Sequence, residues 1–413
     1  MRGPRVRMLT LVLLLCMALS PSAICVADDA VAQSKGTCAT GAATPEPSTP
    51  ANSALATPIG ALGGGGAGGQ PGLRIASLVA RADTIVRGTV ESVAEVGDGV
   101  LTVARGADGY VSPVELGEGV EGQGGLSPNS YPVTVCRVGF KVTASVKGPV
   151  LPPGATISVE SYRPHLGPAW GLLEAGQHGL LLLDDNGALA DLYYPLLPVA
   201  PDVPVMAGDV PPLDAIKEYL LLSMKPGVTE ETLASCIEGA IDLHLQAAGD
   251  ALVPLTRDND PKIVGRALAG LVHFQDARAF PEAVEFILHP PQTAQVQALM
   301  VMCSVGMLTD PELAEAIIPL LSSADATCRR QALSALRHMK DPRNMPTLAA
   351  ALSDADLENR YIAVMGLAET TGRWNAEWAT SWPKFQGNPS YYVDKWLNWW
   401  EGEGKAQYGS SAP

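Results

Sequence analysis

The chain has 413 residues, of which 47% are hydrophobic, 17% are charged and 5% are aromatic. This length suits two or three domains, and the composition excludes a coiled coil, a wholly disordered chain and a membrane protein with many spans. The formal net charge of -15 argues against a nucleic-acid partner, because phosphate backbones require clustered lysines and arginines.

The first residues have the order of a cleaved export signal. Arg2, Arg5 and Arg7 precede an apolar stretch at 8–20, and small residues then lead to Asp28. The apolar stretch is too short to span a bilayer comfortably, although an uncleaved anchor is the alternative. We therefore predict a signal peptide at 1–27, export to the bacterial periplasm or secretion, and no stable membrane insertion after cleavage.

The composition changes twice before residue 200. Residues 28–72 are rich in alanine, threonine, proline, serine and glycine and contain no aromatic residue. Such a segment buries too little apolar surface to offset the entropy of ordering, so we predict a disordered linker. From 73 to 200, short segments with alternating apolar residues predict a small all-β barrel or sandwich.

The clearest strand signals lie on either side of a glycine-rich, acidic segment. In the strand expected at 84–96, Val86 faces the core and Arg87 the solvent, and the strand at 132–147 alternates over its whole length. The segment between them, 97–131, is predicted as a flexible loop. Further strands are expected at 155–161, 178–183 and 189–199, with a hairpin turn at 184–187.

Two short runs in this region resemble a known class of secreted domain. The run from Arg81 to Val90 and the later Val146-Lys147-Gly148 are similar to tissue-inhibitor and netrin-like domains of the OB type. The resemblance covers about 74–200 and implies a protease-inhibitor-like role as one alternative function. In the inhibiting members an N-terminal cysteine is central, whereas Leu73 and Arg74 open this domain.

A proline-rich junction at 201–213 precedes a repeated helical segment. Four apolar blocks begin at residues 266, 297, 331 and 362, at offsets of 31, 34 and 31 residues, and each follows another apolar helix. A period in this range indicates helical pairs stacked as a solenoid. We predict an all-α solenoid over 214–372.

Two of the repeats carry an aspartate and an arginine four residues apart. Asp325 precedes Arg329, and Asp356 precedes Arg360. An aspartate at a helix start caps free N–H groups and can pair with an arginine one turn on. The pattern resembles HEAT-like repeats, including the phycobilisome-lyase type, over about 250–371. The resemblance implies a protein-binding solenoid or, as an alternative, a lyase-like or cofactor-handling enzyme.

Tryptophan is concentrated at the end of the chain, with six of seven residues after position 373. We predict a tryptophan-rich cap at 373–404, because a solenoid end must cover the apolar face of its last repeat. Pro389 fits the start of a helix within it, and 405–413 is predicted as a disordered tail. An aromatic platform for a sugar or peptide is the alternative. It would be formed by Trp396, Trp399 and Trp400.

The sequence contains no His-Glu dipeptide, no Gly-x-Ser-x-Gly and no phosphate-binding loop. We therefore predict no catalytic residue, metal site or cofactor, and a non-catalytic scaffold that binds a protein or peptide. Polar side chains on the second helix of each repeat are expected to form an exposed, partly basic ridge on the concave face. The ridge residues are Lys262, Arg266, Gln295, Gln297, Arg330, Arg337 and Asn359.

Overall fold

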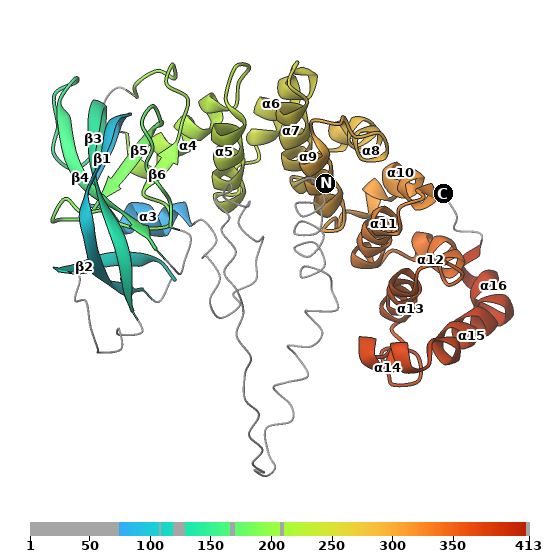
Figure 1. Cartoon of the computed structure of the whole chain (residues 1–413). Coiled ribbons are helices and arrows are strands. Elements are labelled where there is room, and N and C mark those ends of the chain that lie inside the picture. The colour runs from blue at the N-terminus through green and yellow to red at the C-terminus, as the bar shows by residue number, and fades with distance from the viewer. Residues whose placement is uncertain (1–73, 107–108, 119–128, 166–169, 207–209, 410–413) are drawn as a thin grey trace, which may run out of the picture. The chain divides into compact units, whose positions relative to one another are not determined.

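The computed structural model describes residues 74–106, 109–118, 129–165, 170–206 and 210–409. Within them the chain divides into two compact units, the sheet unit at 74–258 and the helical unit at 259–409. The predicted signal peptide, 1–27, and linker, 28–72, lie outside the described residues. The prediction of a β region followed by a helical solenoid is confirmed (Figure 1).

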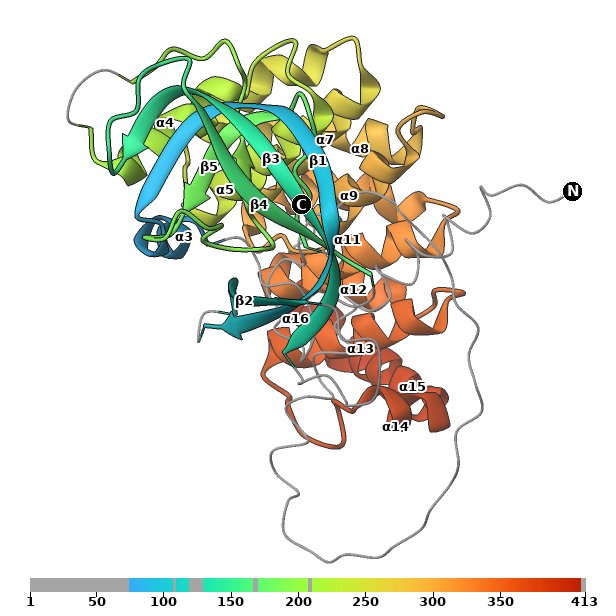
Figure 2. The same cartoon turned by 60° about the vertical axis from the view of Figure 1, so that its left-hand side comes forward.

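The sheet unit contains one antiparallel sheet with the strand order β4-β3-β1-β5-β6, and β2 pairs with β1 away from this path. Figure 2 shows β1 and β3 as long, curved neighbours. Their length gives the sheet a continuous apolar face, on which Phe140, Trp170 and Leu181 pack. The strands are β1 Thr84–Arg105, β2 Val111–Glu118, β3 Ser130–Lys147, β4 Thr156–Pro164, β5 His178–Leu183 and β6 Leu196–Pro198.

The prediction of a loop at 97–131 is wrong over much of its length. Strand β1 continues to Arg105 and β2 lies within the segment, paired with β1. Four irregularities interrupt the β1–β3 register, and those at Val90/Ser92 and Glu95/Gly97 change which side chains face the core just before this segment, so a simple alternation does not continue into it. The segment 119–128 lies outside the described residues.

The predicted strand at 189–199 is mostly a buried, irregular segment. Within it, β6 and an isolated bridge between Leu183 and Leu189 pair with the sheet, and single backbone hydrogen bonds run from Ala190 N to Leu182 O at 3.0 Å and from Leu192 N to Val111 O at 2.8 Å. The Asp191 side chain also holds this segment in place. Its carboxylate accepts the backbone N–H of Val111 in β2 and that of Tyr193 within the segment, both at 2.7 Å. The turn at 184–187 is confirmed, with Ala188 N donating to the Asp184 carboxylate at 2.8 Å.

Four α-helices complete the sheet unit. Helices α3 and α5 are joined by the Ile75 backbone N–H, which donates to Asp242 Oδ2 at 2.7 Å. A Cβ on Gly239 would lie 2.8 Å from Ile75 and 2.9 Å from Leu220, so glycine permits this close packing. The first part of the segment predicted as solenoid, 214–258, therefore packs in the sheet unit. The helices are α3 Ile75–Arg81, α4 Pro212–Ser223, α5 Glu230–Asp242 and α6 Ala248–Leu252, followed by the 3-10 helix η1 Val253–Arg257.

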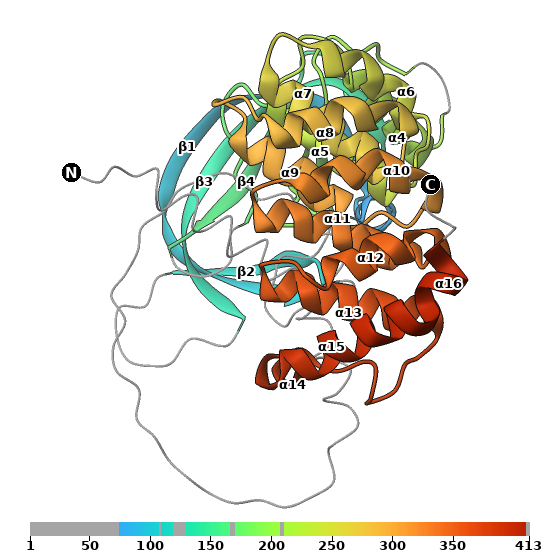
Figure 3. The same cartoon turned by 90° about the vertical axis from the view of Figure 1, so that its right-hand side faces the viewer.

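The helical unit consists of paired helices that follow one another along the chain (Figure 3). The four apolar blocks lie in α7 Pro261–His273, α9 Gln295–Val305, α11 Ala326–Met339 and α13 Leu357–Thr371, as the repeat period predicts. The intervening helices are α8 Phe280–Leu288, α10 Ala314–Ile317 with η4 Ile318–Ser322, and α12 Met345–Ala351. Short 3-10 turns, η2 Ala277–Ala279, η3 Pro311–Leu313 and η5 Pro342–Asn344, begin the later pairs.

After the last repeat the chain forms α14 Trp382–Gly387, α15 Pro389–Trp399, the π-helix η6 Trp400–Gly404 and α16 Lys405–Tyr408. Pro389 is the first residue of α15, as predicted. The predicted disordered tail at 405–413 is wrong for its first residues, because α16 forms there and the Tyr408 ring lies 6.1 Å from that of Trp399. Among the described residues, no helix has the length and apolar character that crossing a membrane requires.

One glycine sets how closely two repeats approach. A Cβ on Gly265 of α7 would lie 2.4 Å from Gln297 Cβ and 2.9 Å from the Phe286 ring. We expect Gly265→Ala to lower the free energy of unfolding by about 1–3 kcal/mol, because the packed neighbours must move. Urea unfolding followed by circular dichroism measures the change. Gly387→Ala is the matched control, since its Cβ would meet no atom within 4 Å. Equal effects of the two substitutions would contradict this explanation.

Candidate functional site

The residues of the predicted ridge lie in three different environments. The structure exposes two of them, Lys262 and Gln295, and covers Arg266 and Arg330 in part. The other three are buried, so the prediction that they are exposed is wrong. They are Gln297, Arg337 and Asn359. The physical reason is that consecutive second helices pack side by side, and these polar side chains lie between them.

Arg337 on α11 forms a bidentate ion pair with Glu369 on α13. Its Nη2 donates to Glu369 Oε1 at 2.6 Å and its Nε donates to Oε2 at 3.1 Å. Only 8% of the arginine side chain and 16% of the glutamate side chain are exposed. A buried, two-point pair of this kind fixes the position of one helix against the next and leaves each charge dependent on its partner.

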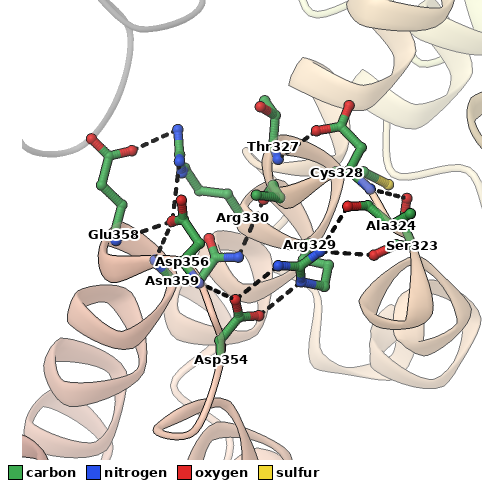
Figure 4. A network of polar contacts seen from close by, with 12 residues as sticks. Ser323, Ala324, Thr327, Cys328, Arg329, Arg330, Asp354, Asp356, Glu358 and Asn359 are labelled. Atoms are coloured by element: carbon green, nitrogen blue, oxygen red, sulfur yellow. Dashed lines mark hydrogen bonds and ion pairs between the residues drawn. The ribbon is translucent and has the colours of Figure 1, made fainter.

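A second ion pair lies at the other end of α11 (Figure 4). Arg329 donates from Nε and Nη2 to the two carboxylate oxygens of Asp354, each at 2.8 Å, and from Nη1 to the Ser323 carbonyl at 2.8 Å. The hydrogen bond from Arg329 lowers the pKa of Asp354 from 3.8 to about 2. The ionised carboxylate thus stabilises the fold above about pH 4, and that contribution is lost as the pH falls through 2.

Arg330 extends the same network toward the start of α13. It pairs with Glu358 at 2.6 Å and with Asp356 at 3.2 Å. Asp356 also caps α13 by accepting the backbone N–H groups of Glu358 and Asn359, both at 3.0 Å. The buried Asn359 amide donates in turn to the Ala326 carbonyl on α11 at 3.2 Å. One carboxylate therefore both caps a helix and joins two repeats.

These contacts confirm the predicted caps and correct the predicted ion pairs. Asp325 caps α11 by accepting the Thr327 N–H at 2.8 Å, as the spacing indicates. Arg329, however, pairs with Asp354 of the following repeat, and Asp356 pairs with Arg330. Arg329 reaches across to the next repeat because the two oxygens of Asp354 accept two of its guanidinium N–H groups side-on, whereas Asp356 accepts from Arg330 while it caps α13.

The structure reveals a second repeated motif, which the predicted elements do not include. An aspartate begins each of the turns η2, η3 and η5 and accepts the backbone N–H two residues further on, at 2.8–3.0 Å. Gln275, in the left-handed conformation, also accepts the Asp310 N–H at 2.8 Å and so joins two repeats. These aspartates recur at the same spacing as the apolar blocks, and this spacing is the sequence signal by which they can be recognised. They are Asp276, Asp310 and Asp341.

The tryptophan-rich segment packs on the last repeat. Eight consecutive residues of α13, from Tyr361 to Ala368, are buried, so this helix requires cover on all its faces. The Tyr361 ring lies 5.2 Å from Trp382 and 5.3 Å from Phe385. Trp396 is fully buried, and its indole N–H donates to the Trp378 carbonyl at 2.9 Å.

The three tryptophans of the alternative aromatic platform do not present free ring faces together. Trp396 and Trp399 are buried against one another, with ring centroids 5.2 Å apart, and Trp400 is partly covered. The exposed aromatic residues of this segment are instead Trp374 and Tyr391. The prediction of a platform built on Trp396 and Trp399 is therefore wrong. These two rings form a packed cluster and fill the space that a ligand would need.

Comparisons with known proteins agree with the repeat architecture. Residues 284–368 match the family model of HEAT repeats, so this region consists of HEAT-like repeats and the helical unit is a repeat-type scaffold. No match among curated proteins was found. Among solved structures, the chain is similar to an engineered protein determined by the Northeast Structural Genomics Consortium. The identity is 17%, the match covers 40% of this chain and 76% of that chain, and the TM-score is 0.26.

The chemistry of the assembled site is that of paired charges. In the network around α11, the guanidinium groups of Arg329, Arg330 and Arg337 face carboxylates of the next repeat. Across the part of the chain that the structure describes, no three histidine, cysteine or acidic side chains form a group that could hold a metal ion. The arrangement therefore serves to hold helices in register, and it gives the scaffold a defined shape.

Proposed function

We propose that the chain is an exported, non-catalytic scaffold whose HEAT-like unit binds another protein or a peptide. The observation that carries the proposal is a partly exposed apolar stripe on α9. Val296, Leu299, Met300 and Cys303 recur at helical spacing and are only half-buried, and Met307 beyond the helix end is 55% exposed. Apolar side chains left open on an otherwise acidic protein favour contact with a partner surface.

The ion pairs of α11 support the proposal in a different way. They fix α11 against α13, so part of the helical unit that contains the α9 stripe is held in place before a partner arrives. Binding to a preformed surface avoids the entropic cost of ordering it. Stacked helical repeats build extended surfaces of this kind, and the partner is a protein or peptide segment that offers apolar side chains.

Capture from the native cell envelope tests the proposal. The exported protein, for which an N-terminus at Asp28 is expected, is purified from that fraction and immobilised as bait. Met307→Glu combined with Met300→Gln is expected to weaken partner capture at least about tenfold, because a charge is placed in the apolar contact. The lyase-like and inhibitor-like alternatives stay predictions.

The matched control is Val150→Glu, which places the same charge at an exposed apolar residue of the sheet unit. It is expected to capture the partner as the wild type does, and both variants are expected to keep their unfolding midpoints. Undiminished capture by the α9 variant, or the failure of the wild type to retain any protein, would contradict the proposal. A chain that retains Met1 and stays in the cytoplasm would contradict export.

A further inference from the structure

Arg87 is a buried cation that joins the sheet to the segment following β6. Its predicted solvent-facing position is wrong, since only 2% of the residue is exposed. Nη2 donates to the carbonyls of Pro201 at 2.9 Å and Ala200 at 3.3 Å, and Nη1 donates to that of Pro204 at 3.2 Å. The guanidinium also lies 5.1 Å from the ring centroid of Tyr219 on α4. One side chain therefore holds the segment 200–204 against β1.

The fourth hydrogen bond of Arg87 is with a histidine of β5. Arg87 Nε lies 3.2 Å from His178 Nε2, and Thr89 Oγ1 lies 2.8 Å from His178 Nδ1. A guanidinium has only donors, so His178 Nε2 must accept and cannot carry a proton. The neutral ring then carries its hydrogen on Nδ1 and donates it to Thr89. The arrangement exists for only one tautomer of neutral His178.

We propose that Arg87 and His178 form an acid-sensitive latch. When His178 Nε2 is protonated, its N–H faces the Arg87 Nε–H, and two donors without an acceptor repel each other. The guanidinium then moves away and releases the carbonyls of 200–204. Residues 200–206 then detach from the sheet, while the strands keep their own ladder. This inference concerns the sheet unit alone and does not rest on the proposed binding function.

Burial and the neighbouring charge of Arg87 favour the closed latch at neutral pH. Burial, and then the positive charge of Arg87, lower the pKa of His178 from 6.5 to about 4. From the facing segment, Asp202 is exposed and paired with Lys225 at 2.5 Å, and α4 contributes Tyr219. Because the folded pKa lies below the unfolded one, the stabilisation is complete above 6.5 and is lost as the pH falls toward 4.

Amide hydrogen exchange of the full chain tests the latch. After correction for intrinsic rates, segment 200–206 of the wild type is expected to exchange at least about tenfold faster at about pH 4 than at about pH 7. His178→Gln offers an uncharged acceptor to Arg87 and is expected to abolish this acceleration. His289→Gln, at an exposed histidine of the helical unit, is the matched control and is expected to keep it.

Two hydrogen-exchange results would overturn the proposal. One is an acid response that persists in His178→Gln, and the other is equal protection of 200–206 in the wild type at both pH values. A nitrogen-15 spectrum of wild-type His178 gives an independent readout that does not require the variant to fold. The Nδ1–H tautomer is expected at neutral pH, and an Nε2–H tautomer would refute the geometry on which the latch depends.

Discussion

Replacing Arg337 with alanine is expected to lower the free energy of unfolding by about 3–5 kcal/mol. The substitution leaves the Glu369 carboxylate, of which 16% is exposed, without its guanidinium partner inside the stack. An uncompensated charge between two packed helices costs far more than the ion pair itself contributes. Urea unfolding of the wild type and the variant, followed by helical circular dichroism, measures the difference.

Arg343 provides a matched control on the surface of the same unit. It pairs with Glu312 at 2.8 Å and with Asp341 at 2.7 Å, but 49% of its side chain is exposed. Arg343→Ala is therefore expected to cost no more than about 1 kcal/mol, since water screens and solvates the remaining carboxylates. If the two alanine variants lose equal stability, burial is not what makes Arg337 important.

The second large effect is expected at the centre of the cap. Trp396→Ala should lower the free energy of unfolding by about 3–5 kcal/mol, because a fully buried indole leaves a cavity and the Trp378 carbonyl loses its donor. The same denaturant unfolding measures this loss. Limited proteolysis is expected to cut the variant within 373–409 before it cuts the repeats, since α15 no longer holds to α13.

Trp374 is the corresponding control in the same segment. Its side chain is 55% exposed, so Trp374→Ala is expected to change the free energy of unfolding by no more than about 0.5 kcal/mol. Should Trp396→Ala prove equally mild, or should early cleavage fall within the repeats instead, the role of the tryptophan-rich segment as a packed cap would be contradicted.

Much of the fold follows from periodicity in the sequence. The apolar blocks beginning at 266, 297, 331 and 362 each lie in a second helix, and Pro389 begins α15. These signals are local, because a helix needs one apolar face and a defined first turn. The caps at Asp325 and Asp356 were predictable for the same reason, as a cap depends only on the next three residues.

The candidate site was less predictable because burial depends on partners distant in sequence. Gln297 and Asn359 are polar residues on amphipathic helices, and only the packing of neighbouring repeats covers them. Arg87 stands at a position whose alternation predicts exposure, yet the 200–204 carbonyls enclose it. In β1, the shifts in register change which side chains face the core partway along the strand. A fixed period of two residues does not predict such a change.

Charged side chains of α11 bind it to the repeat that contains α13. A double-mutant cycle on Arg337→Met and Glu369→Leu tests this role most directly. We expect each single variant to lose about 3–5 kcal/mol and the double variant to unfold within about 1 kcal/mol of the wild type, since two apolar side chains replace the pair without leaving a buried charge. Losses that simply add in the double variant would show that the two residues act independently, and would contradict the account.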